Sequence, residues 1–165
     1  MEDVREIPLS RGMVALVDAD DYERVVRLGR WCADPSHRTF YARKNLYTPG
    51  TRKLTPLLMH RFITGWEYVD HINGDGLDNR RANLRPADHF QNMANKRRYR
   101  NNTSGFKGVT RNTGTGRPWR ASIRANNKRR HLGYYDTPEL AARAYDAAAT
   151  QLFGAFAHLN FPKEH

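Results

Sequence analysis

The sequence predicts an α+β protein made of two small parts. Short apolar runs of strand length alternate with segments of helical spacing, and polar loops rich in glycine and asparagine separate them. The chain has 165 residues and one cysteine, Cys32, which excludes an internal disulfide framework and a multi-cysteine zinc site. No apolar run approaches the ~20 residues of a membrane span, and the N-terminus does not resemble a signal peptide. We therefore expect a cytoplasmic protein that is not secreted.

The N-terminal segment 1–63 is expected to form a small α+β unit. The apolar run 12–17 predicts a strand, and apolar residues at helical spacing predict a helix over 22–28. Residues 40–43 and 54–63 predict further strands. No constellation of catalytic residue types stands out in this segment.

Residues 64–95 differ in composition. A short strand is predicted at 69–72, followed by a long loop rich in Asn, Asp and Gly, a second short strand at 83–85 and a helix over 87–100. Polar residues that can carry chemistry gather here. We single out Asp70, His71, Asn83 and Asn92.

The C-terminal part contains three predicted strands and one helix. After a turn-rich segment at 101–105, strands are expected at 106–112, 119–125 and 128–134. Thr137 and Pro138 then begin a helix that ends at Gly154. The simplest architecture is a three-stranded antiparallel sheet packed on that helix.

Charge is distributed unevenly along the chain. The chain carries 28 Lys and Arg against 17 Asp and Glu, and fourteen of these basic residues lie in 96–165 with only four acidic ones. Such a field attracts a polyanion, and double-stranded DNA is the expected partner. A basic surface that only keeps the protein soluble is the alternative. A membrane partner is disfavoured because no basic amphipathic helix is present, and no obligate protein partner is evident.

The segment from Val69 to Arg81, continued by Asn83-Leu-Arg85 and Gln91-Asn92, resembles the HNH motif of phage and intron-encoded homing endonucleases. The resemblance covers about 55–98 and, more loosely, 14–30. It implies a ββα-metal nuclease that forms, with the N-terminal unit, a first domain over 1–100.

The same resemblance implies roles for the four polar residues. His71 would be the general base that activates water, and Asn83 would orient it. Asp70 and Asn92 would hold one divalent cation, Mg²⁺ by preference with Mn²⁺ as an alternative. His60 is expected to be structural, and His89 is a weaker candidate for the metal site. Arg85 is left open between a phosphate contact and an ion pair with Asp78.

Residues 104–162 resemble the DNA-binding domain of plant APETALA and ethylene-response factors. The matching residues are Gly105-Phe-Lys-Gly-Val109, Trp119 to Arg124, Leu132 to Asp136, Ala141 to Ala149 and Leu159-Asn-Phe-Pro162. This implies a second domain over 101–165 that lays its sheet in the major groove. The DNA contacts implied are Lys107, Trp119, Arg124 and Arg129, with phosphate contacts from Arg111 and Arg120.

Departures from the plant pattern limit what can be transferred. Thr110 and Asn112 stand where the plant proteins have arginine, Ser122 replaces a glutamate and His131 a tryptophan, so the plant target sequence does not carry over. Strand alternation places Trp119 on the helix-facing side, which leaves it open between core and DNA. The run Lys96, Arg97, Arg98 and Arg100 is interpreted as a phosphate clamp, with a solvated helix face as the alternative.

Together these observations predict a metal-dependent DNA endonuclease of homing or phage type, targeted by a C-terminal, sequence-preferring DNA-binding domain. Two other classes stay open. One is a non-catalytic DNA-binding regulator that retains an inactive nuclease fold. The other, an RNA-binding protein, is weaker because the aromatic motif of the common sheet-based RNA readers is absent.

Overall fold

The computed structural model describes residues 3–36, 39–50, 53–95, 102–114, 116–126 and 128–162. The chain forms two compact units, 1–88 and 89–165. Within the described ranges, no helix is long and apolar enough to span a membrane.

The first unit begins with a two-stranded antiparallel sheet. It consists of β1 (Val4–Pro8) and β2 (Val14–Asp18), joined through the short 3-10 helix η1 (Ser10–Gly12) and followed by helix α1 (Ala19–Val26). The strand and helix predicted around Asp18 are confirmed. Strand β1 was not predicted, because it buries only Ile7 and its other residues are exposed.

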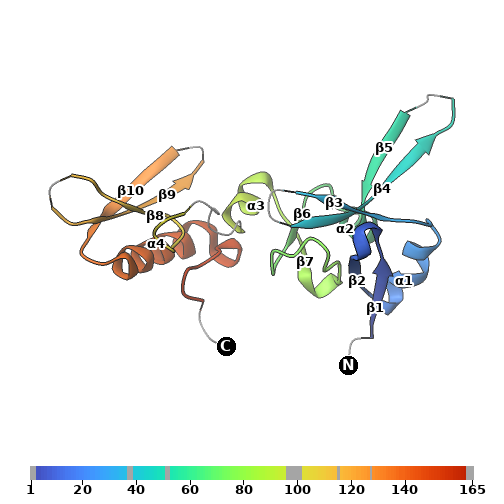
Figure 1. Ribbon diagram of the computed structural model, residues 1–165, viewed down its shortest axis with the longest axis horizontal. Helices are drawn as coiled ribbons and strands as arrows, with labels where there is room; N and C mark the ends of the chain where they lie inside the picture. The colour runs from blue at the N-terminus through green and yellow to red at the C-terminus, as the bar shows by residue number, and fades with distance from the viewer. Residues whose placement is uncertain are drawn as a thin grey trace. The chain divides into compact units, whose positions relative to one another are not determined.

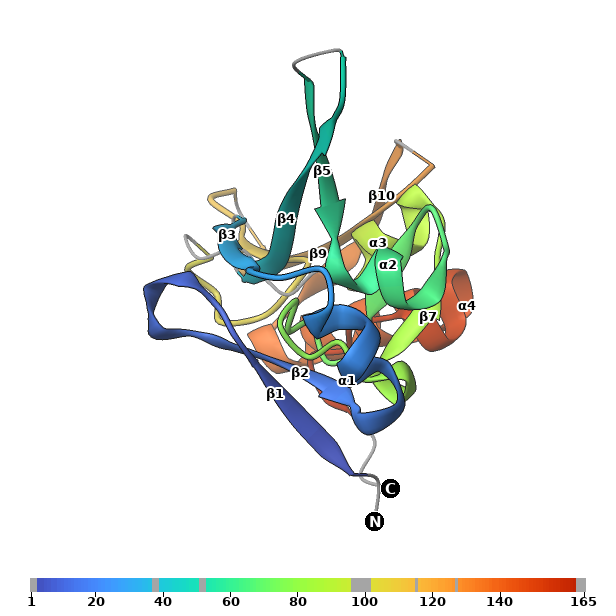
Figure 2. The ribbon, with the colours of Figure 1, turned by 90° about the vertical axis from the view of Figure 1, so that its right-hand side faces the viewer.

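A second sheet has the order β3-β4-β5, built from β3 (Cys32–Pro35), β4 (Phe40–Thr48) and β5 (Lys53–Leu58). Strand β4 is longer than β3, so the far end of the β4–β5 hairpin pairs only with itself. Figures 1 and 2 show this hairpin extending away from the rest of the first unit.

The prediction of a strand over 54–63 is wrong in its second half. Strand β5 ends at Leu58, and helix α2 (Met59–Thr64) follows. Met59, His60 and Ile63 are buried on α2, and a helix turns such neighbours toward one side, whereas a strand would alternate them. Gly65 ends the helix with a φ of 74°, a left-handed conformation that favours glycine.

The third sheet of the first unit is a hairpin of two very short strands, β6 (Val69–His71) and β7 (Leu84–Pro86), as predicted. The long loop between them ends in the 3-10 helix η2 (Arg81–Asn83). Strand β2 fastens this loop, because Leu16 exchanges backbone hydrogen bonds with Leu77 and Asn79 at 2.9 and 2.8 Å.

One apolar core joins all of these elements. It contains Val17, Val25 and Met59, which are fully buried, together with Val69 of β6 and Leu84 of β7. The Arg81 guanidinium links η2 to α1, since it donates two hydrogen bonds of 2.7 and 2.9 Å to the buried carboxylate of Asp21. The N-terminal segment is therefore the support on which the β6–β7 hairpin rests.

The second unit begins with helix α3 (His89–Asn95). A sheet of order β10-β9-β8 follows, formed by β8 (Val109–Arg111), β9 (Trp119–Ala125) and β10 (Lys128–Tyr135). Helix α4 (Pro138–Phe153) and the 3-10 helix η3 (Gly154–Phe156) come last. The predicted sheet and helix are confirmed, and Thr137 caps α4 by accepting a hydrogen bond from the Leu140 backbone.

Helix α3 belongs to the second unit, whereas the sequence analysis assigned it to the first domain. The boundary predicted at 100/101 stays a prediction. The proposed phosphate clamp at 96–100 lies outside the described residues.

Two glycines with positive φ offer a test of the packing in the second unit. A Cβ atom at Gly108 (φ 77°) would overlap the ring of Tyr145, whereas one at Gly105 (φ 81°) would meet nothing within 4 Å. We expect Gly108→Ala to lower the free energy of unfolding by about 2–5 kcal/mol, from backbone strain plus overpacking. Gly105→Ala should lower it by only about 1–2 kcal/mol. Urea titrations followed by circular dichroism would measure both, and equal losses would contradict this account.

Candidate functional site

His71 lies at the end of β6, enclosed by two other rings. The centroid of its ring is 4.9 Å from that of His60, in an edge-to-face arrangement, and 5.7 Å from that of Tyr41. Tyr41 and His60 also contact each other, with centroids 5.5 Å apart. The two histidines are each only 5% exposed. Strand β4, helix α2 and strand β6 thus each contribute one ring to a buried cluster, which we call the ring cluster.

Burial sets the protonation of the two histidines. Loss of hydration lowers the pKa of His71, and the neighbouring Asn79 side chain and Asp70 carboxylate oppose this effect only in part. Burial, together with His71 and Arg61, lowers the pKa of His60 to about 3. Both imidazoles are therefore neutral near pH 7. A neutral imidazole can accept a proton, as a general base must.

Asp70 lies next to His71 in the chain and is paired with Arg85. The two residues are direct partners in the β6–β7 register, and Arg85 Nε and Nη2 lie 2.8 and 2.6 Å from Asp70 Oδ2. Their side chains are 7% and 16% exposed. The alternative of an ion pair between Arg85 and Asp78 is wrong, because Asp78 is bound by Arg80 at 2.7 and 2.8 Å.

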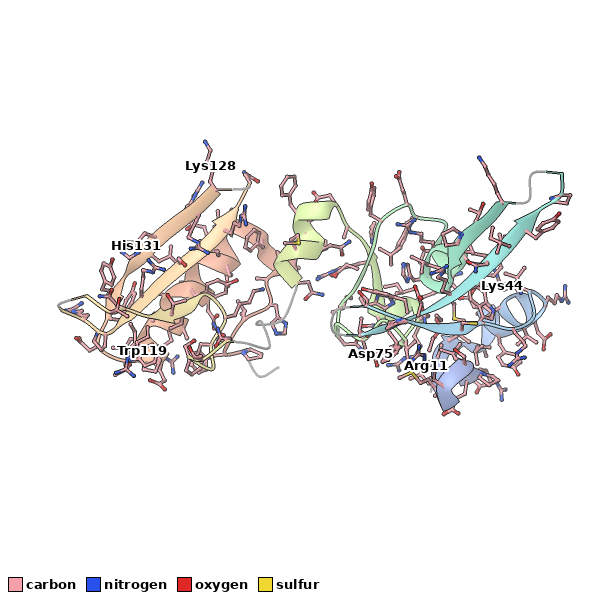
Figure 3. All side chains as sticks on the ribbon, turned by 45° about the horizontal axis from the view of Figure 1, so that its top comes forward. Arg11, Lys44, Asp75, Trp119, Lys128 and His131 are labelled. Carbon is pink, nitrogen blue, oxygen red and sulfur yellow. The ribbon has the colours of Figure 1, made fainter. Side chains whose placement is uncertain are left out.

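Asn83 holds the long loop in place. Its Nδ2 donates to Asn73 Oδ1 and to the Asp78 backbone carbonyl, and its Oδ1 accepts from the Asn73 backbone N–H at 2.9 Å. These bonds turn the loop back onto the hairpin, and Figure 3 shows Asp75 on that loop. The role expected for Asn83, orienting His71, stays a prediction. The side chain that the structure brings to His71 is that of Asn79.

The structure thus brings together Asp70 and His71 with Asn83 close by, and it adds two residues that sequence reasoning missed, Tyr41 and Asn79. It also pairs Arg85, whose role was left open, with Asp70. His60 was expected to be structural, and its place against His71 was not foreseen. Asn92 lies on α3 in the second unit, so its predicted role as a metal ligand stays a prediction.

In the second unit, the sheet has one face against α4 and one face free of it. Ala121 and Ile123 of β9 are buried in the core with residues of α4, so the alternating Arg120 and Arg124 point to the other face. Arg129 is the register partner of Arg124, which places it on the same face. Three of the six predicted contacts that lie among the described residues of this unit therefore share one surface, which we call the free sheet face.

The other predicted contacts lie elsewhere. Trp119 packs against the core of this unit. Its register partner Arg111 lies over the indole, with the guanidinium carbon 6.0 Å from the ring centroid. Figure 3 shows Trp119 on the same sheet as His131. The Lys107 ammonium donates to the Ala94 carbonyl at 2.6 Å. The core alternative is thus favoured for Trp119, and the DNA-binding roles of Lys107, Arg111 and Trp119 stay predictions.

Comparisons with known proteins relate the second unit to plant transcription factors. The family model of the AP2 domain matches residues 104–155. Ethylene-responsive transcription factor ERF010 of Arabidopsis thaliana is 57% identical over 47 residues, which is 27% of this chain and 26% of that protein. AP2-like ethylene-responsive transcription factor CRL5 of Oryza sativa subsp. japonica is 44% identical over 68 residues, 38% of this chain and 11% of that protein. The chain thus spans about a quarter or less of these plant proteins.

A viral relative covers both units. The protein named Uncharacterized HNH endonuclease L560, of Acanthamoeba polyphaga mimivirus, is 31% identical over 144 residues, which is 82% of this chain and 73% of that protein. No solved structure gives a significant match.

The burial of His60 predicts a pH dependence of stability. The pKa of His60 is about 3 in the folded chain against an ordinary 6.5, so the unfolded chain binds the extra proton between those values. The free energy of unfolding should therefore fall as pH drops from 6.5 toward 3, by up to about 1.4 kcal/mol per pH unit. His60→Gln should flatten this slope in urea titrations, while His131→Gln, on the exposed strand β10, should not. An unchanged slope in His60→Gln would refute the assignment.

The ion pair in the β6–β7 hairpin predicts a large effect of removing one partner. Arg85→Ala leaves the Asp70 carboxylate buried without its counter-charge, and we expect a loss of about 3–5 kcal/mol in the free energy of unfolding. Asp70→Asn combined with Arg85→Ala removes the uncompensated charge of the carboxylate and should recover part of the lost free energy of unfolding. A double variant that is no more stable than the single one would argue against the pair.

Proposed function

The chain belongs to the same family as the mimiviral protein named an HNH endonuclease, and from this premise we propose that it is a metal-dependent DNA endonuclease of homing or phage type. Its AP2 domain, a DNA-binding domain, would direct cleavage to preferred sequences. The observation that carries the proposal is the placement of a buried, neutral His71 directly beside the Asp70 carboxylate on β6.

The donor set around Asp70 is compatible with a hard divalent cation. No group of three His, Cys, Asp or Glu side chains among the described residues could together hold a metal ion. Mg²⁺ does not need one, since it keeps several waters and is commonly held by one or two carboxylates plus substrate phosphates. Asp70 and the amide oxygen of Asn92 are the residues that would hold it. The bound cation would stabilise negative charge on the phosphate and on the leaving 3′-oxygen.

His71 would take the proton of the attacking water as the new oxygen–phosphorus bond forms and the bond to the 3′-oxygen breaks. The ring cluster fits this role, because Tyr41 and His60 fix the plane of the His71 ring and exclude bulk water from it. Asn79 and the carboxylates near His71 favour the imidazolium that results, since each of them raises the pKa of His71.

The AP2 domain would supply affinity and sequence preference. Arginines on the free sheet face, at positions 120, 124 and 129, are suited to phosphate oxygens and to guanine edges. Tethering this domain to the nuclease raises the local concentration of the nuclease at its site.

A second candidate, a DNA-binding regulator with an inactive nuclease fold, has one observation in its favour. Asp70 already has a buried counter-charge in Arg85, so its charge balance does not require a metal ion. The plant relatives named above are also transcription factors by name. The presence of His71 beside Asp70 favours the nuclease.

Loss of the general base tests the proposal. We expect His71→Ala to slow the nicking or linearisation of supercoiled plasmid in Mg²⁺ or Mn²⁺ by about 10²–10⁴-fold, with unchanged DNA binding in a gel-shift assay. The wild-type protein in EDTA should be equally inactive, and His158→Ala in the second unit should keep full activity. Metal-dependent cleavage that persists in His71→Ala would exclude this role. A folded wild-type protein that binds but does not cut a library of DNA sites would favour the regulator.

A further inference from the structure

Two asparagines in the loop between β6 and β7 differ in the hydrogen bonds that their side chains make. Both amide hydrogens of Asn83 are donated within the loop, to Asn73 Oδ1 at 3.0 Å and to the Asp78 carbonyl at 2.8 Å, and its Oδ1 accepts from the Asn73 backbone N–H. Asn79 is fully buried, yet its Oδ1 accepts no hydrogen bond from the described residues. Proteins rarely bury an acceptor in this way, because its lost hydration costs stability, and a role in the chemistry of a site is one reason to keep it.

Strand β2 fixes the position and the orientation of the Asn79 amide. The Asn79 backbone N–H donates to the Leu16 carbonyl at 2.8 Å, and the Leu16 N–H donates to the Leu77 carbonyl at 2.9 Å. The same Leu77 carbonyl accepts a hydrogen bond of 3.0 Å from Asn79 Nδ2. This bond distinguishes the two ends of the amide, since only its nitrogen can donate to a carbonyl. The Asn79 side chain therefore offers an acceptor, Oδ1, to its other neighbours.

The neighbour that Asn79 affects is His71. The residue before Asn79 is Asp78, and Asn83 holds it through its backbone carbonyl. The Asn83 carbonyl in turn accepts from the N–H of Ile72, which follows His71 in the chain. Burial has the largest effect on the pKa of His71 and lowers it, and Asn79 has the largest effect among the groups that raise it, as an acceptor near an imidazole N–H does. Contacts of catalytic groups are often longer than a full hydrogen bond before the substrate binds.

Other side chains near His71 are less suited to accept its N–H. Strand alternation turns Asp70 to the opposite face of β6, where its Oδ2 accepts both bonds of an ion pair. Tyr41 and His60 meet His71 with their rings, at centroid distances of 5.7 and 4.9 Å. The Asn79 oxygen is therefore the acceptor that the fold places best.

We propose that Asn79 is the positioning residue for His71. Its Oδ1 accepts the N–H of one ring nitrogen, so the other nitrogen stays unprotonated and available to the attacking water. A neutral imidazole has two tautomers, and a hydrogen bond at one nitrogen decides which of them is populated. Asn83 has a different task under this proposal, which is to hold the loop that carries Asn79. The inference rests on the nuclease activity proposed above, but the tautomer itself can be measured without DNA or metal.

The first experiment determines the tautomer of His71. Long-range proton–nitrogen NMR spectra of the full-length, histidine-labelled protein in EDTA near pH 7 separate the two ring nitrogens, and His71→Ala identifies the signals. We expect one dominant tautomer in the wild-type protein and a mixture in Asn79→Leu, whose side chain has a similar size but no acceptor. A mixture in the wild-type protein, or the same dominant tautomer in Asn79→Leu, would overturn the proposal.

Asn79→Asp is the matched control. It loses the same bond from Nδ2 to the Leu77 carbonyl as Asn79→Leu does, but it keeps an acceptor at the Oδ1 position. It should therefore retain one dominant tautomer, and urea titrations of both variants show whether a difference between them follows from unfolding. If the buried charge keeps Asn79→Asp from folding, the comparison of Asn79→Leu with the wild-type protein still decides.

Plasmid cleavage then connects the tautomer with the proposed activity. Asn79→Leu should lower kcat by about 10²-fold, with KM and gel-shift affinity unchanged, whereas Asn79→Asp should stay within about tenfold of the wild-type kcat. Full kcat in Asn79→Leu would refute the positioning role and leave the nuclease intact. A wild-type protein whose single tautomer depends on Asn79 but which cuts no DNA would support the contact and refute the nuclease.

Discussion

A hairpin of two three-residue strands cannot hold itself together in water, and this constraint organises the whole first unit. Strands β6 and β7 carry Asp70, His71 and Arg85, yet they contribute only Val69 and Leu84 to the apolar core. Apart from Leu77 in the loop between them, the other apolar side chains of this core come from earlier in the chain. The segment before it therefore acts as a scaffold, and a precise placement of His71 depends on residues far from the polar motif.

The polar groups of the site are arranged so that little uncompensated charge is buried. His60 and His71 are neutral because burial lowers the pKa of each. The Asp70 carboxylate lies next to His71 in the chain, and Arg85 provides its counter-charge at 2.6 Å. A carboxylate left alone at this depth would be costly, so Arg85 makes the site stable without a metal ion.

Sequence reasoning located the elements of both units better than it located the contacts within the site. The β6–β7 hairpin, β9 and α4 could be predicted because turn residues, alternation and an N-cap are local signals. Helix α2 was missed because a continuous apolar run such as 54–63 fits a strand and a buried helix equally well. The approach of Tyr41 and His60 to His71 is long-range and leaves no local signal. Arg85 illustrates the limit: its role was left open between a phosphate contact and an ion pair with Asp78, and only the strand register pairs it with Asp70.

The distribution of charge suggests how a small chain achieves DNA affinity. The free sheet face offers three arginines from β9 and β10, and Ser122 and His131 replace residues that the plant pattern supplies. If the first unit binds the same duplex, the second contact becomes intramolecular, and affinity can rise by orders of magnitude without any single strong interaction.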